Sequence, residues 1–196
     1  MTERAYSDQT KSMGVIRAAI ALPGPQSPKR EFQTIFADEF DYVWFTLRRF
    51  GVWERDLEDI THEVFITVYR HLDDYDPARP LRPWLFSFAY RMASDYRKLA
   101  RHRAESLDAR TDYLDPSPSA VEQLAMRESL DLAQRALDQL DVDRRAVFLL
   151  HDVDGYPMPE VCAALQIPLN TSYSRLRLAR EQFSKTLNRL RAKRGE

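Results

Sequence analysis

The chain has 196 residues, a hydrophobic content of 44% and a formal net charge of −1, which allows one ordinary core or two small ones and excludes wholesale disorder. It has only five glycines, and Leu, Ala, Arg, Glu and Asp are abundant, so the composition favours an all-α fold. The one cysteine, Cys162, excludes an internal disulfide, and we expect it to be buried in a structural role.

Charge is unevenly distributed along the chain. Acidic residues outnumber basic ones between 104 and 170, whereas basic residues dominate 171–196. A second basic cluster consists of Arg91, Arg97, Lys98, Arg101 and Arg103. This segregation predicts two electropositive surfaces on an acidic body, although two solvated helix faces remain an alternative.

The apolar stretch Met13–Leu22 is interrupted by Arg17 and is too short to span a bilayer. A weak signal peptide is its other interpretation. We therefore expect a cytoplasmic protein without membrane insertion.

In chain order, residues 1–29 contain three prolines and no lasting periodicity, which predicts a mobile tail. Helices are predicted at 31–50, at 54–72 and from about Pro83 to 103, with a loop at 74–83. Their inward stripes are Phe36, Phe40, Val43, Leu47 and Phe50; Leu57, Ile60, Val64, Val68 and Leu72; and Leu85, Phe88, Met92, Tyr96 and Leu99. These helices are predicted to form a first domain at 30–103.

The acidic, proline-containing segment 104–119 is typical of a flexible linker, and a second helical domain is predicted at 120–193. Ser119 and Glu122 have the spacing of a capping box, and Asp141 is a candidate cap for a helix that stops at Gly155. Pro159 suits the first turn of a short helix, and a long helix begins at Asn170. The sequence thus predicts two small helical domains: a three-to-four-helix bundle and a four-helix domain.

A short helix, a tight turn and a second helix rich in Arg, Ser and Thr are typical of a helix-turn-helix, whose second helix enters the major groove. In the long helix, Leu176, Ala179, Phe183, Leu187 and Leu190 form the apolar stripe. Asn170 is a candidate cap there, and the free N–H groups of the helix start would also suit a phosphate. The candidate DNA contacts are Asn170, Thr171, Tyr173, Ser174, Arg175, Arg177, Leu178 and Arg180. The alternative, a salt-bridged terminal helix, is disfavoured because Glu181 is the one acid available to pair these bases.

A family resemblance rests on these residues. The segment GYPMPEVCAALQIPLNTSYSRLRLAREQF resembles the fourth conserved region of bacterial extracytoplasmic-function sigma factors, with its Gly-Thr-Val-x-Ser-Arg-Leu-x-x-Ala-Arg pattern. The matching residues are Thr171, Ser174, Arg175, Leu176, Ala179 and Arg180, whereas Asn170 and Ser172 replace the usual glycine and valine. Two further segments resemble the second conserved region of the same family: DLEDITHEVFITVYRHL and RPWLFSFAYRMASDYRKLARHR. The resemblance covers about 31–103 and 120–192.

The resemblance implies a sigma factor of the sigma-70 family, which binds core RNA polymerase, recognises the −35 and −10 promoter elements and nucleates promoter melting. It also implies contacts with the β′ coiled coil and the β flap of the polymerase, an anti-sigma factor, a stress or envelope-signal regulon and a monomeric free state. The helix at 54–72 mixes acids with exposed apolar groups, which suits docking onto a protein. The residues implied in core polymerase binding are Asp59, His62, Glu63, Phe65 and Ile66. Ordinary surface residues are the alternative there, and His62 has no second histidine at metal-ligand spacing.

The third helix places an aromatic side chain beside basic ones, an arrangement that suits unstacked single-stranded DNA. The resemblance implies that this helix and the loop at 75–83 read the −10 element. The candidate residues are Trp84, Arg91, Asp95, Lys98 and Arg101. Arg91 stands where the family often has asparagine, and Trp84 as a plain core residue remains open.

We expect no enzymatic activity, cofactor or metal, because the sequence lacks a carboxylate cluster, a metal-ligand set and a Gly-rich phosphate loop. A rival hypothesis is a helix-turn-helix repressor or activator that binds a palindrome as a dimer, with the first domain as a ligand or dimerisation module.

Overall fold

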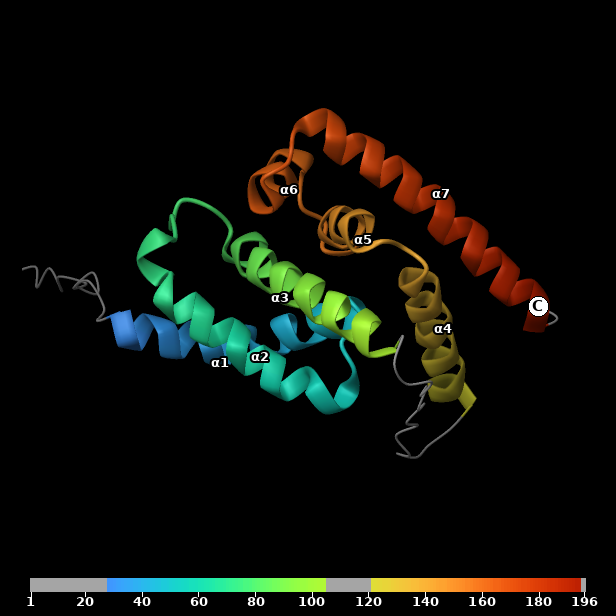
Figure 1. The fold of residues 1–196 in the computed structure, drawn as a ribbon, viewed down its shortest axis with the longest axis horizontal. Helices are drawn as coiled ribbons and strands as arrows, with labels where there is room; N and C mark the ends of the chain where they lie inside the picture. Colours follow the sequence, from blue (N-terminus) through green and yellow to red (C-terminus); the bar gives the residue numbers. More distant parts are fainter. Residues whose placement is uncertain (1–27, 105–120, 195–196) are drawn as a thin grey trace, which may run out of the picture.

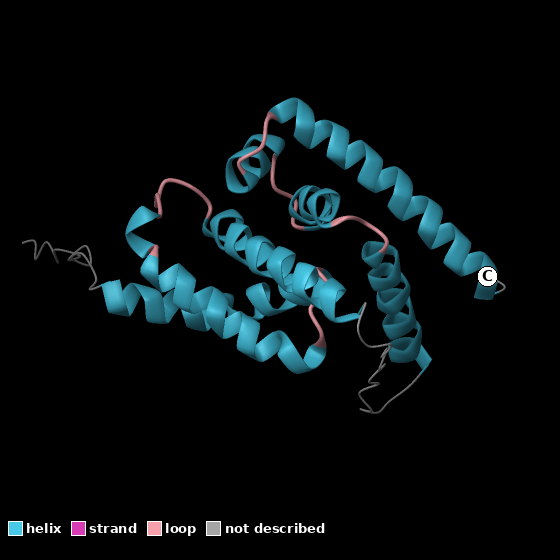
Figure 2. Cartoon of the chain, in the orientation of Figure 1, coloured by secondary structure: helices cyan, strands magenta, loops and turns pink. Residues whose placement is uncertain are grey.

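The computed structural model describes residues 28–104 and 121–194, with side chains described in 32–99 and 128–193. Within these ranges the chain is built of helices and short connections and has no strand (Figure 2), which confirms the all-α prediction. Most of the predicted tail and linker lies outside these ranges, as does Ser119 of the predicted capping box, and the side chain of its partner Glu122 is not described.

The first domain is a group of three helices, α1 (Pro28–Arg49), α2 (Glu54–Arg70) and α3 (Leu81–Ala104), each of which contacts the other two (Figure 1). Their apolar residues recur at helical spacing, so one face of each helix is buried against its neighbours. The fully buried members of the predicted stripes are Val43, Leu47, Phe50, Leu57, Val64, Val68 and Leu85. Gly51 follows α1 with φ +85°, a conformation that suits a residue without Cβ.

The predicted helix ends are nearly correct. α2 ends at Arg70 rather than Leu72, and the chain continues in a short 3-10 helix, η1 (Leu72–Asp74), which still buries Leu72. α3 begins at Leu81, so Pro83 lies inside the first turn, where its missing N–H is not needed.

The predicted burial of Leu99 is wrong, because this side chain is 69% exposed. Tyr96, one turn earlier on α3, donates a hydrogen bond to Asp56 at the start of α2. Leu99 lies nearly one turn further along α3, past the contact with the start of α2, which accounts for its exposure.

The second domain contains α4 (Val121–Asp138), α5 (Val142–Phe148), α6 (Met158–Leu165) and α7 (Leu169–Arg194). Asp141 caps α5 as predicted, since its carboxylate accepts a hydrogen bond from the backbone N–H of Arg144 at 2.9 Å. The predicted helix 142–153 changes to a π-helix, η2 (Leu149–Val153), in its second half. Cys162 is half-buried, and its Sγ lies 3.1 Å from the hydroxyl of Ser172.

The two domains pack against each other. α3 contacts both α5 and α6 (Figure 1), and most of the buried apolar residues of both domains belong to one continuous core. Sequence periodicity predicts which face of a helix is buried but not which domain covers it, so this contact is a finding of the structure.

Core burial predicts different outcomes for two leucines. Leu47→Ala removes a side chain that is fully buried, and it should lower the free energy of unfolding by about 2–5 kcal/mol. Leu99→Ala is the matched control on α3 and should change it by less than about 0.5 kcal/mol. Urea denaturation followed by circular dichroism measures both. Equal losses in the two variants would contradict the assignment of the core.

Candidate nucleic-acid interface

The helix-turn-helix consists of α6, a tight turn and the first turns of α7. Gln166 ends α6 in the left-handed conformation, with φ 55° and ψ 45°. Its C-cap N–H donates to the carbonyl of Cys162, and this turn sends the chain back toward α7. The arrangement confirms the predicted helix–turn–helix order.

The start of α7 presents polar side chains to solvent. Asn170, Tyr173 and Ser174 are exposed, whereas Thr171 and Leu178 are half-buried. α7 begins at Leu169, and the Ser172 N–H donates to the carbonyl of Pro168 at 3.0 Å. Asn170 therefore lies inside the first turn, and the prediction that it caps the helix is wrong.

The three arginines near the start of α7 differ in their partners. Arg175 donates a hydrogen bond of 2.5 Å to Asp143 on α5. Arg180 donates two hydrogen bonds, of 2.7 and 2.6 Å, to the carboxylate of Asp152 in η2. Arg177 only approaches Glu181 at 3.7 Å, and its side chain is 71% exposed. Among these three side chains, Arg177 is the one most available to an external anion.

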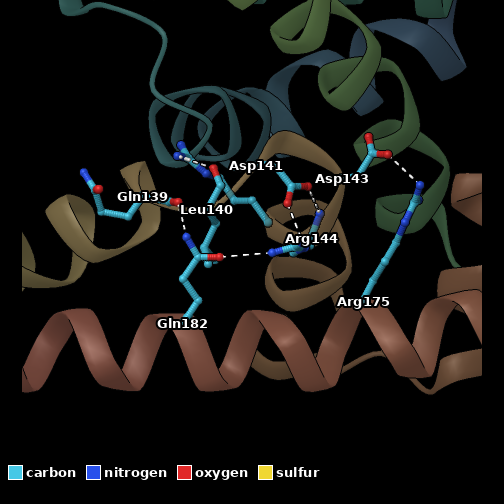
Figure 3. A network of polar contacts seen from close by, with 8 residues as sticks. Gln139, Leu140, Asp141, Asp143, Arg144, Arg175 and Gln182 are labelled. Carbon is cyan, nitrogen blue, oxygen red and sulfur yellow. Dashed lines mark hydrogen bonds and ion pairs between the residues drawn. The ribbon is translucent and has the colours of Figure 1, made fainter.

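These ion pairs correct the expectation that Glu181 is the one acid able to pair the basic residues of this helix. Asp143 and Asp152 come from other elements that pack on α7, and Figure 3 shows Asp143 facing Arg175. The same view shows Arg144 of α5 donating to Gln182 of α7, which also donates to the carbonyl of Gln139. The acidic bias of 104–170 was visible in the sequence, but not these pairings.

The candidate face of α3 lines a cavity. Trp84 is half-buried between Tyr75, at 5.0 Å between ring centroids, and Phe88, at 4.9 Å. Arg91 lies over the Phe88 ring at 4.7 Å and donates to Ser87 at 3.2 Å. Trp84 thus combines both interpretations that the sequence left open, since its ring packs on the core and also borders a cavity of about 530 Å³.

Two other candidate residues of α3 lie further along the helix. Asp95 and Lys98 are exposed and form an ion pair of 3.0 Å with each other. The side chain of Arg101 lies outside the described residues. Trp84 and Arg91 are therefore the candidates that the cavity brings together.

The opposite wall of this cavity belongs to the second domain. Glu160, Ala163, Ala164 and Gln166, in and just after α6, line it. Arg79, in the loop before α3, donates to Glu160 at 3.0 Å. The cavity therefore lies between the domains.

The candidate protein-binding face of α2 is exposed for the most part. Asp59, His62, Glu63 and Ile66 are all accessible, with Ile66 51% exposed. Phe65 is only 1% exposed, so its predicted place on this surface is corrected: it packs against Phe36 and stacks with Phe40. Phe65 is buried because α1 presents aromatic side chains toward α2 at this point.

Other kinds of site find no support in the described residues. No group of three or more His, Cys, Asp or Glu side chains within 32–99 and 128–193 could hold a metal ion. Over the same part of the chain, none of the helices combines the length and apolar character that crossing a membrane requires.

The comparison with known proteins covers both domains. Residues 36–103 match the family Sigma-70 region 2, and residues 130–183 match Sigma-70, region 4. The RNA polymerase sigma factor CnrH of Cupriavidus metallidurans is 30% identical over 181 residues, which span 88% of this chain and 93% of CnrH. The ECF RNA polymerase sigma factor SigE of Mycolicibacterium smegmatis is 31% identical over 85% of this chain and 65% of its own length.

The chain belongs to the extracytoplasmic-function sigma factors of the sigma-70 family. Sigma factors are transcription initiation factors and not enzymes, and regions 2 and 4 bind promoter elements and RNA polymerase. Region 2 corresponds to α1–α3 of this sigma factor, and region 4 contains the helix-turn-helix.

Solved structures of other sigma factors resemble this one, and two of them are described here. CnrH in complex with the cytosolic domain of CnrY has a TM-score of 0.60 and 27% identity, over 82% of this chain and 89% of that one. The sigma factor RpoE of Bartonella quintana, in complex with the anti-sigma factor NepR, has a TM-score of 0.62 over 81% of this chain and 98% of that one. At 16% identity, the second likeness concerns the fold alone.

The polar network between α3 and α5 predicts a pH effect. Burial, and then the hydrogen bond to Asp143, raise the pKa of Tyr90 to about 12 from its ordinary value of 10. Because the folded state keeps the phenol protonated, this bond contributes stability below pH 10, which is lost as the pH rises toward 12. The difference in unfolding free energy between the sigma factor and its Tyr90→Phe variant should therefore shrink between pH 10 and 12, as measured by urea denaturation. A constant difference would contradict this assignment.

Proposed function

We propose that this sigma factor contacts the −35 element with the start of α7 and the −10 element with the cavity-lining face of α3. One observation supports the proposal: the second domain has an exposed surface at the start of α7, and the first domain has a cavity-lining surface on α3 with different side-chain chemistry. The α7 surface is polar and cationic, as a duplex reader requires, whereas Trp84 and Arg91 combine a ring with a guanidinium, as an unstacked base requires.

At the −35 element, we assign the leading contact to Arg177. Arg175 and Arg180 are held by carboxylates, which fixes the direction of their guanidinium groups and leaves fewer donors for DNA. Asn170, Thr171, Tyr173, Ser174 and Leu178 complete the surface around the helix start. Free N–H groups at this end of α7 suit a phosphate, which would position the helix in the groove.

At the −10 element, stacking on Trp84 contributes about 1–3 kcal/mol per base, comparable with the roughly 1.4 kcal/mol needed to open one base-pair step. Trapping one or two extruded bases would therefore offset the cost of the first steps of melting without ATP. Asp95, Lys98 and Arg101 lie further along α3, and they complete the proposed contacts with the −10 DNA strand.

The exposed face of α2, with Asp59, His62, Glu63 and Ile66, is proposed to bind the β′ coiled coil of core polymerase, and Phe65 supports this face from below. Region 4 would contact the β flap.

An anti-sigma factor is a further proposed partner, because the two solved structures described above are complexes, one with the cytosolic domain of CnrY and one with NepR. A stress or envelope-signal regulon and a cytoplasmic location belong to the same proposal.

Removal of the Arg177 guanidinium should weaken promoter binding. Arg177→Ala should raise the dissociation constant of the polymerase holoenzyme for promoter duplex about tenfold or more, and lower the salt slope by about 1 if the contact is to a phosphate. Arg189→Ala, an exposed arginine further along α7, is the control with the same change of charge. Fluorescence anisotropy at several salt concentrations measures both. Equal effects of the two substitutions would argue against a localised contact.

Charge reversal on α2 should weaken core binding. Glu63→Lys places a cation on the proposed docking face and should reduce affinity for core polymerase about tenfold. Asp131→Lys makes the same change on the exposed side of α4 and should leave affinity near that of the native chain. A titration of labelled chain with core polymerase measures both, and unchanged binding by the α2 variant would remove this face from the proposal.

A further inference from the structure

Two exposed arginines of α7 lie one turn apart in different electrostatic settings. The side chains of Arg177 and Arg180 are 71% and 55% exposed, and residues three apart lie on the same side of a helix. Arg177 approaches only Glu181, at 3.7 Å, and water screens a pair whose two members are both exposed. Arg180, in contrast, is bound by a carboxylate from another element of the second domain.

Asp152 holds Arg180 at two atoms. Its Oδ2 accepts a hydrogen bond from Nε of Arg180 at 2.7 Å, and its Oδ1 accepts one from Nη2 at 2.6 Å. This two-point pairing of a guanidinium with a carboxylate is the strongest form of such a contact. The hydrogen bond to Asp152 raises the pKa of Arg180 above its ordinary value. The pair as a whole therefore carries no net charge at neutral pH.

The π-helix η2 fixes the position of the Asp152 carboxylate. Leu149 and Leu150, at the start of η2, are buried, and the N–H of Asp154 donates to the carbonyl of Leu149 across the wider π turn at 2.8 Å. The side chain of Asp152 is itself only 20% exposed. Short π segments often occur where a helix must direct a particular side chain. The segment therefore presents this carboxylate to α7 from an anchored backbone.

This pairing affects how α7 interacts with DNA. A phosphate that approached Arg180 would also approach the carboxylate of Asp152, which repels it. Each phosphate contact adds about 0.9 to the salt slope, or about eightfold in affinity between 1 M and 0.1 M salt, and it carries no sequence information. Asp152 thus removes attraction that is independent of sequence and leaves the exposed Tyr173, Ser174 and Arg177 available to the groove.

We propose that Asp152 is a specificity-determining residue of this sigma factor: it acts through Arg180 and prevents that side chain from binding DNA phosphates indiscriminately. Asp152 is a positioning residue, because it touches Arg180 and not the DNA. The inference rests on the proposed −35 role of α7. Its effect is opposite in sign to the loss of a DNA contact, so the two can be measured separately.

Asp152→Asn tests the inference, because it removes the charge and keeps the size and one carbonyl acceptor. The full chain should bind a duplex of scrambled sequence about fivefold to tenfold more tightly at 0.1 M salt, with a salt slope steeper by about 0.9. Asp131→Asn makes the same change of charge on the exposed side of α4 and should alter the affinity by less than about twofold. Fluorescence anisotropy at several salt concentrations measures both variants.

A double-mutant cycle separates this effect from a general loosening of the domain. In an Arg180→Gln background, Asp152→Asn should give no gain in affinity, because the released cation is missing. A loosened domain would respond equally in both backgrounds. Arg180→Gln alone should leave the salt slope within about 0.3 of the native value, since the paired arginine makes no phosphate contact. This exposed substitution decides the matter even if Asp152→Asn does not fold.

The polymerase holoenzyme tests the effect on specificity. In a promoter complex the base contacts fix the register of α7, so the released Arg180 can use only the phosphate that this register offers, whereas on scrambled DNA it can use any phosphate nearby. Asp152→Asn should therefore reduce the ratio of promoter affinity to scrambled-duplex affinity at least about threefold.

Three results would overturn the inference: no gain on scrambled DNA in Asp152→Asn, a gain that persists without Arg180, or a salt slope lowered by about 0.9 in Arg180→Gln. If Arg177→Ala weakens promoter binding and any of these results is found, the inference about Asp152 fails and the −35 role of α7 stands. If Arg177→Ala has no effect on promoter binding, the −35 role itself fails.

Discussion

The arrangement of the helices depends on one buried charge, the guanidinium of Arg145 on α5. The side chain is fully buried, and it donates to the carbonyl of Arg49 at 3.1 Å and to that of Leu140 at 3.3 Å, with Asp138 as its ion-pair partner. Burial, and then the neighbouring Arg97, lower the pKa of Arg145 to about 10, so the group remains charged at neutral pH. A buried cation needs these acceptors, which come from the ends of α1 and α4.

This constraint places α5 and thereby the rest of the second domain. Because Arg145 ties α5 to the end of α1, Asp143 on the same helix lies beside Tyr90 of α3 and Arg175 of α7. The π-helix that follows α5 places Asp152 against Arg180 and is followed by Asp154, which faces α1. Three aspartates of the second domain, Asp143, Asp152 and Asp154, thus accept hydrogen bonds from side chains of α1, α3 and α7.

The sequence predicts what depends on local patterns. Helical spacing identified Leu47, Val64 and Leu85 as core residues, and Asp141 as a cap. The predicted burial was wrong for Leu99, because its exposure depends on how far the neighbouring helices reach along α3. The predicted surface position was wrong for Phe65, because its burial depends on the aromatic side chains that α1 presents to α2. The Arg175–Asp143 and Arg180–Asp152 pairs are separated by 32 and 28 residues, and no local rule gives such partners. The motif residues of α7 were found, but not which arginine is left available.

We propose that this sigma factor selects promoters only as part of the polymerase. Run-off transcription with core polymerase, the purified chain and a linear promoter template tests it most directly. We expect a transcript of the length set by the start site, formed only when core and chain are both present, with no symmetric footprint on the same DNA from the chain alone. Absence of the transcript together with a symmetric footprint from the chain alone would contradict it and support a dimeric repressor instead.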